Sequence, residues 1–350
     1  MKSFKLKKHQ IDQLFDPFID KKTRLVAPSV NSLGQVDFNV IHEKQEIVWN
    51  ALIPLKPPKS FLFPASNSLV QFDEKNPVKL KSDHENPIAQ QMIFGLKPCD
   101  LAAIKYMDNF FTTDIADHDY LARREKTMIV GVACENPSNA CFCTTMEVDP
   151  GNSSMADIFI VPTGEDLYME CLTEKGEELI AGLSKGWKEA SPEEIKKRKE
   201  EISQTTSSKL IEHIDMTKAK GQLENVYDHA FWSKYSEPCI VCGACTFDCP
   251  TCSCFDMNDH LSSISRGCRY RSWDSCAFND FTLHASGHNP RSSKVHRLRQ
   301  RILHKYQYTI EKMNTYSCTG CGRCIRVCPA GINTRSILKD AKEALNESGN

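Results

Sequence analysis

Two short cysteine motifs carry the clearest chemistry in this chain. The first reads Cys239-Ile-Val-Cys242-Gly-Ala-Cys245-Thr-Phe-Asp-Cys249-Pro and the second Cys318-Thr-Gly-Cys321-Gly-Arg-Cys324-Ile-Arg-Val-Cys328-Pro. In this C-x2-C-x2-C-x3-C-P pattern, three closely spaced cysteines bind one 4Fe-4S cluster and the fourth binds the other cluster. The motifs therefore predict one cluster on Cys239, Cys242, Cys245 and Cys328, and a second on Cys318, Cys321, Cys324 and Cys249.

Zinc is the alternative metal for both motifs, because it too binds four thiolates. Zinc motifs usually present their cysteines as two separated pairs, whereas here a tight quartet occurs twice in the same chain. The spacing therefore favours two clusters that carry single electrons over a cysteine-rich metal scaffold without redox chemistry.

The first half of the chain contains a separate group of cysteines. Cys99 stands in Gly-Leu-Lys-Pro-Cys-Asp, and Cys134, Cys141 and Cys143 follow in one short segment. Both segments come directly after predicted strands, so loops at neighbouring strand ends could bring these thiols together. We expect a third metal site there, most simply another 4Fe-4S cluster. Two alternatives remain: buried core cysteines, or an active site that acts on a sulfur species.

Other cysteines lie close to the first motif or beyond it. Cys252 and Cys254 follow it in Pro-Thr-Cys-Ser-Cys, and Cys276 comes later. They could be alternative metal ligands or thiols that donate weak hydrogen bonds to a cluster. They could equally be small buried apolar residues, which is our interpretation of Cys171.

The composition narrows the class of protein. Lys plus Arg (44) nearly balance Asp plus Glu (45), so no overall charge points to nucleic acid or to a membrane surface as a partner. The basic start of the chain lacks the apolar core of a secretory signal, and no stretch approaches the length of a membrane-spanning helix. We therefore expect a cytoplasmic chain without membrane insertion, whose 17 cysteines are thiolates rather than disulfides.

A stretch between the two motifs is strongly basic. Residues 284–306 contain no acidic residue, and the run includes Arg297, Arg299, Arg301 and Lys305. A solvated helix face is the default interpretation of such a run. The alternative is that fixed positive charge raises the reduction potential of a cluster or attracts an acidic partner.

The pattern along the chain predicts an α+β protein. Residues 1–218 are expected to form a mixed α/β domain, with strands at 24–30, 61–64, 92–96, 128–133 and 157–161 and helices at 101–111 and 172–183. Ser191 and Pro192 predict the start of a charged helix that runs to about residue 215. Residues 219–350 are expected to form a helix-rich, ferredoxin-like domain, with helical stretches at 223–235 and 295–313.

Several phrases of the sequence resemble one known family. They are Gly-Leu-Lys-Pro-Cys-Asp-Leu (95–101), Cys-Phe-Cys (141–143), Cys-Pro-Thr-Cys-Ser-Cys (249–254), Arg-Ser-Trp-Asp-Ser-Cys (271–276) and Gly-His-Asn-Pro-Arg (287–291). The chain is similar in these segments to the family that contains sulfhydrogenase beta subunits and the corresponding iron–sulfur subunit of anaerobic sulfite reductase. The resemblance places Cys99, Cys134, Cys141 and Cys143 in the shared pattern.

The resemblance also implies a function. Subunits of this family carry 4Fe-4S clusters and relay electrons between a flavoprotein subunit that handles NAD(P)H and a catalytic redox subunit such as a hydrogenase, a sulfite reductase or a heterodisulfide-reductase-like protein. This chain contains no Gly-x-Gly-x-x-Gly fingerprint for a dinucleotide. The expected role is therefore electron transfer within an oxidoreductase complex, with the reactions themselves on other subunits.

Overall fold

The computed structural model describes residues 2–19, 23–49, 51–73, 89–183 and 186–348. The first half of the chain forms a large mixed sheet in the order β3-β2-β5-β6-β7-β8-β1-β9. The central strands β2, β5, β6 and β7 are parallel, and the remaining neighbours are antiparallel. The strands are β1 (Ser3–Lys7), β2 (Thr23–Val30), β3 (Val36–Ile41), β5 (Gln90–Leu96), β6 (Thr127–Val132), β7 (Ile158–Thr163), β8 (Asp166–Cys171) and β9 (Lys188–Glu189).

Each face of the sheet packs a core of its own, because successive side chains of a strand point to opposite faces. Met92 and Phe94 belong to one core, which the segment Lys8–Leu14 and helix α3 (Glu174–Ala181) cover. Ile93 belongs to the other core, which includes side chains of α1 (Pro98–Phe110), α2 (His118–Glu125) and α4 (Pro192–Lys209). Burial on both faces explains why the central strands are continuous apolar runs.

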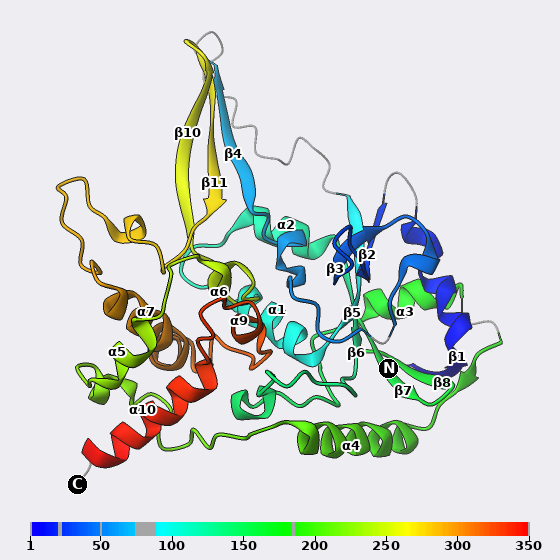
Figure 1. The fold of residues 1–350 in the computed structure, drawn as a ribbon. Coiled ribbons are helices and arrows are strands. Elements are labelled where there is room, and N and C mark those ends of the chain that lie inside the picture. Colours follow the sequence, from blue (N-terminus) through cyan, green and yellow to red (C-terminus); the bar gives the residue numbers. More distant parts are fainter. Residues whose placement is uncertain (1, 20–22, 50, 74–88, 184–185, 349–350) are drawn as a thin grey trace.

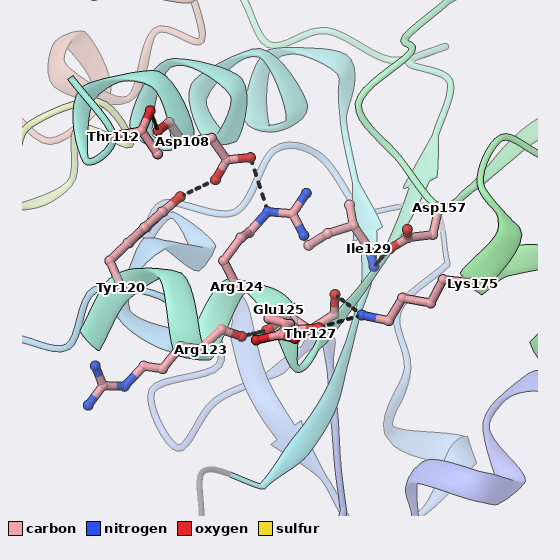
Figure 2. Close-up of polar contacts among 10 residues, drawn as sticks. All are labelled: Asp108, Thr112, Tyr120, Arg123, Arg124, Glu125, Thr127, Ile129, Asp157 and Lys175. Atoms are coloured by element: carbon pink, nitrogen blue, oxygen red, sulfur yellow. Dashed lines mark hydrogen bonds and ion pairs between the residues drawn. The ribbon is translucent and has the colours of Figure 1, made fainter. Parts of the chain in front are cut away.

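Buried polar contacts fix α2 against α1 and against the start of β6 (Figure 2). The Asp108 carboxylate accepts hydrogen bonds from Tyr120 Oη at 2.6 Å and from Arg124 Nε at 3.1 Å. At the start of β6, Thr127 Oγ1 donates to the Arg123 carbonyl of α2 at 2.6 Å, and the Thr127 carbonyl accepts from Lys175 Nζ at 2.8 Å.

The second half of the chain is helical around a third core. Its elements are the short helical turn Leu223–Val226, α5 (Phe231–Ser236), α6 (Ala244–Phe247), α7 (Lys294–Leu303), the π-helical segment His304–Tyr308, α8 (Thr309–Met313), α9 (Arg323–Arg326) and α10 (Thr334–Ser348). The core joins Trp232, Leu303 and Leu338 with Phe142 and Met146 from the first half of the chain. The two halves of the sequence therefore share buried surface.

A three-stranded arm projects from the body of the molecule (Figure 1). It has the order β10-β11-β4, with β10 (Phe255–Ser263) and β11 (Arg266–Trp273) from the segment between the cysteine motifs and β4 (Ser66–Asp73) from the first half of the chain. The sequence did not predict this arm. β10 is exposed over almost its whole length, so it lacks the apolar face by which a strand is usually recognised.

Most of the expected elements are confirmed, and the errors have local causes. The segment 61–64 is not a strand, because Pro58–Phe61 forms a 3-10 turn. Ser191 caps α4 as expected by accepting the Glu193 N–H at 3.2 Å, but the helix ends at Lys209. The helix expected at 223–235 is split into two short pieces, whereas 295–313 is helical throughout.

The α+β class is thus confirmed, while the division of the chain at residue 218 stays a prediction. No helix in the described ranges combines the length and the apolar character needed to cross a bilayer.

Candidate metal centres

The two cysteine motifs follow the same backbone course. The residue before the second cysteine is left-handed in both, with φ of 60° at Val241 and 61° at Gly320. The residue after that cysteine is left-handed as well, with φ of 74° at Gly243 and 73° at Gly322. A β-branched residue such as Val241 rarely adopts this conformation, which marks the first loop as locally strained.

Close packing explains why glycine is required in these loops. A Cβ atom at Gly243 would lie 2.7 Å from Phe278 Cζ, and one at Gly322 would lie 2.4 Å from the Ala140 carbonyl oxygen. At Gly320 a Cβ atom would lie 2.6 Å from the Cys143 N. The second motif therefore rests directly on the loop that carries Cys141 and Cys143.

The first cavity is lined by Cys324 and by the four cysteines that the sequence assigns to one cluster, Cys239, Cys242, Cys245 and Cys328. Among these four, the origin is mixed: three come from the first motif and the fourth from the second. The Ile332 N–H donates to Cys328 Sγ at 3.3 Å. Cys242 is exposed, and the neighbouring Ile240 is 64% exposed. This cavity therefore lies at the protein surface.

The second cavity is lined by the other predicted set, Cys249, Cys318, Cys321 and Cys324. Phe142, Ile302 and Tyr306 close it with apolar surface. The Gly320 N–H donates to Cys318 Sγ at 3.4 Å. Cys324 and Arg301 line both cavities, so the two sites are adjacent.

The donors in these cavities suit iron–sulfur clusters. Every candidate ligand is a thiol, and backbone N–H groups point at the sulfurs, as they do around such clusters. The Thr319 hydroxyl, which lines the second cavity, is buried without a hydrogen-bond partner among the described residues. Within those residues, no three Cys, His, Asp or Glu side chains converge as a single metal ion would require. A cluster instead bonds its thiolates to different irons, which keeps them apart around a cavity.

Four basic side chains of the stretch between the motifs are buried. Arg297, Arg299 and Arg301 are each 7% exposed and Lys305 is 5% exposed, so a solvated helix face was the wrong interpretation for these four side chains. Arg301 Nη2 donates to the Cys245 carbonyl at 2.7 Å. Lys305 Nζ donates to Cys249 Sγ at 3.4 Å, to Thr251 Oγ1 at 3.0 Å and to the Ser317 carbonyl at 2.8 Å.

Lys305 stays charged in this interior. Burial alone lowers the pKa of Lys305, but the nearby sulfurs, first Cys249, whose own pKa is lowered, and then Cys252, outweigh that effect and raise the pKa of Lys305 overall. The contacts of Lys305 match the alternative in which fixed positive charge acts on a metal site.

A further buried cation was not recognised from the sequence. Lys59 is 6% exposed, and its Nζ donates to the carbonyls of Thr246 at 3.3 Å and Cys252 at 3.0 Å. The same ammonium lies 4.2 Å from the centre of the Trp273 ring. Burial lowers the pKa of Lys59. A single lysine beside prolines gives no indication in the sequence that its side chain is buried next to the first cysteine motif.

The four cysteines of the first half gather around Cys141. Cys99, Cys141 and Cys321 pack together in one buried cluster, and Cys141 Sγ lies 3.6 Å from the Cys321 carbonyl. Burial, followed by the neighbouring thiols of Cys141 and Cys134, raises the pKa of Cys143 to about 12. The group thus lies against the second cavity, of which Cys321 forms part.

The remaining candidates lie beside the cavities. Cys252 is a close neighbour of Cys249, and Cys254 of Cys276. Among the described residues, the walls of the two cavities do not include Cys252, Cys254 or Cys276. Cys171 is fully buried in β8, as expected for a core residue.

A buried ion pair joins the second motif to the first half of the chain. Arg323 Nη1 donates to Asp100 Oδ1 at 2.6 Å, and both side chains are fully buried. Arg323 Nε also donates to the Pro54 carbonyl at 2.8 Å. Asp100 follows Cys99 and Arg323 lies between Cys321 and Cys324, so the pair connects two cysteine groups. Nothing in the sequence predicted that Asp100 and Arg323 would form an ion pair.

The class of protein suggested by these thiol-lined cavities agrees with the comparison with known proteins. Residues 238–332 match a family described as "4Fe-4S dicluster domain". Over 312 residues, the chain is 28% identical to sulfhydrogenase 2 subunit beta of Pyrococcus furiosus, covering 88% of this chain and 89% of that protein. The family resemblance seen in the sequence is thereby confirmed, and the chain is an iron–sulfur electron-transfer protein.

We predict that the Asp100–Arg323 pair stabilises the fold as a unit. Asp100→Leu should lower the free energy of unfolding by about 3–5 kcal/mol, because it leaves the Arg323 charge buried and unpaired. The double variant Asp100→Leu/Arg323→Met should lose less than Asp100→Leu alone. Urea denaturation of anaerobic protein, together with iron content, measures both effects.

The exposed pair Arg269–Asp259 provides the matched control, and Asp259→Leu should leave the denaturation midpoint unchanged. A double variant less stable than Asp100→Leu would contradict the account of the buried pair.

Proposed function

We propose that this chain is the electron-relay subunit of a cytoplasmic multisubunit oxidoreductase. In the proposed complex it passes electrons between a flavoprotein subunit that handles NAD(P)H and a catalytic redox subunit. The observation that carries the proposal is the exchange of fourth cysteines: Cys328 joins the first cavity and Cys249 joins the second. Each bound cluster would supply a carrier of one electron.

The order of the cysteine groups supports a path through the molecule. The group of Cys99, Cys134, Cys141 and Cys143 lies against Cys321 of the second cavity. The second cavity shares Cys324 with the first, and the first lies nearest the surface at Cys242. We propose a third 4Fe-4S cluster in the first group, so that three carriers form one continuous relay.

The alternative is that the first group is an active site for a sulfur species. Cys99 is 4% and Cys141 2% exposed. Such deep burial favours a relay over a site that a substrate must enter and leave. The similarity to a sulfhydrogenase beta subunit is compatible with either role.

Iron content tests the number of clusters. Protein purified without oxygen should contain about twelve irons and twelve labile sulfides per chain for three clusters, or about eight of each for two. Cys141→Ser/Cys143→Ser should remove about four irons and leave the reducible electron paramagnetic resonance (EPR) signals of the other two clusters.

Cys171→Ser is the control for losing a buried thiol outside these groups, and it should keep all the iron. If Cys141→Ser/Cys143→Ser kept all the iron but lost turnover in the complex, catalysis at this group would replace the third cluster. A colourless protein loaded with zinc would refute the proposed relay.

We also expect Lys305 to raise the reduction potential of the second cluster. Its ammonium donates to Cys249 Sγ and places a positive charge beside the site. If this charged hydrogen bond stabilises the reduced cluster over the oxidised one by about 1.5–3 kcal/mol, Lys305→Met should lower the potential of this cluster by about 60–130 mV.

A redox titration followed by EPR measures the potential, and Lys312→Met, an exposed lysine, is the control. An unchanged or higher potential in Lys305→Met would contradict the assignment.

A further inference from the structure

Two cysteines at the base of the arm are held next to each other. Cys254 lies directly before β10 and Cys276 shortly after β11, and these strands are antiparallel with Phe255 opposite Trp273. The Asp274 N–H donates to the Cys254 carbonyl at 3.0 Å, which continues the pairing beyond the strands. Each of the two thiols is also the largest influence on the pKa of the other, lowering that of Cys254 and raising that of Cys276, as neighbouring sulfurs do. The arm therefore brings two sulfurs together that are far apart in the sequence.

Neighbouring contacts fix this pair beside the metal centres. Thr246 Oγ1 of α6 donates to Ser275 Oγ at 2.8 Å, which holds the residue before Cys276 against the helix that carries Cys245. Arg301 lines both cavities, and its Nη1 lies 3.9 Å from Sγ of Cys252, two residues before Cys254. Cys276 is 8% exposed and Cys254 is half-buried. Ala277, the residue after Cys276, lines the first cavity, so the pair lies beside that cavity.

We propose that Cys254 and Cys276 form a redox-active pair that switches between two thiols and one disulfide. Oxidation removes two electrons and two protons and forms the S–S bond, and reduction reverses this. The electrons come singly from reduced 4Fe-4S clusters in the neighbouring cavities, two for each disulfide reduced. The protons are exchanged with water at the half-buried Cys254. This inference rests on the proposed electron-transfer function.

The chemical consequence is storage of an electron pair. Clusters accept and release single electrons, whereas flavins and many redox substrates exchange two. A dithiol beside the clusters would hold the second electron until both are needed. The pair uses thiols that the two cluster cavities do not require.

Thiol trapping of the intact holoprotein tests the proposal. The protein is poised under anaerobic conditions with the clusters oxidised or reduced, then unfolded in excess iodoacetamide and analysed by peptide mass spectrometry. The Cys254 and Cys276 peptides should be linked by a disulfide in the oxidised sample and alkylated in the reduced one. The Cys254→Ser variant should take up two electrons fewer per chain in a reductive titration and keep its full iron content.

The half-buried Cys268, on the same arm, provides the control: Cys268→Ser should take up as many electrons as the unmodified protein. Alkylation of both cysteines in both samples would overturn the redox pair. Loss of iron in Cys254→Ser and in Cys276→Ser would also overturn it, because the two residues would then be cluster ligands. Iron content and EPR of the same samples test the clusters separately, so failure of the pair is distinguishable from failure of the proposed function.

Discussion

A thiolate buried in a protein loses the hydration that stabilises its charge, and this chain places many cysteines in its interior. Buried cations offset that cost. Lys305 contacts Cys249, Arg301 lies between the two cavities, and Arg323 pairs with Asp100 beside Cys321. These side chains are themselves costly to bury, so the cations and the thiol groups depend on each other. In the helical half of the chain, buried cations and buried cysteines therefore stabilise each other.

The first half of the chain is part of the same arrangement. Its sheet fixes α1, α1 presents Cys99 and Asp100, and Asp100 holds Arg323 of the second motif. Gly320 and Gly322 bring that motif into contact with the loop of Ala140 and Cys143. This explains how similarity to a sulfhydrogenase beta subunit extends over most of the chain rather than over the dicluster region alone. We interpret the α/β half as a support for the relay and as the site of its proposed continuation.

Local patterns predicted the parts of this structure that depend on local chemistry. Cysteine spacing grouped the residues that line each cavity, and apolar runs located the central strands. The features that the sequence did not predict depend on contacts between residues that are far apart in the chain. Nothing near Lys59 or Arg323 in sequence shows that each is buried, and the arm pairs β4 from the first half of the chain with β11 from the second half. The direction in which the basic side chains point likewise depends on the cavities that they face.

The central claim is that two cluster sites share a wall formed by Cys324 and Arg301. EPR at stepwise lower potentials tests it most directly in the Cys141→Ser/Cys143→Ser variant, which is expected to keep only these two clusters. When one of the two clusters is reduced, the spectrum should be a simple signal. When both are reduced, magnetic interaction between adjacent clusters should broaden and split it. A fully reduced spectrum equal to the sum of two independent signals would contradict the shared wall.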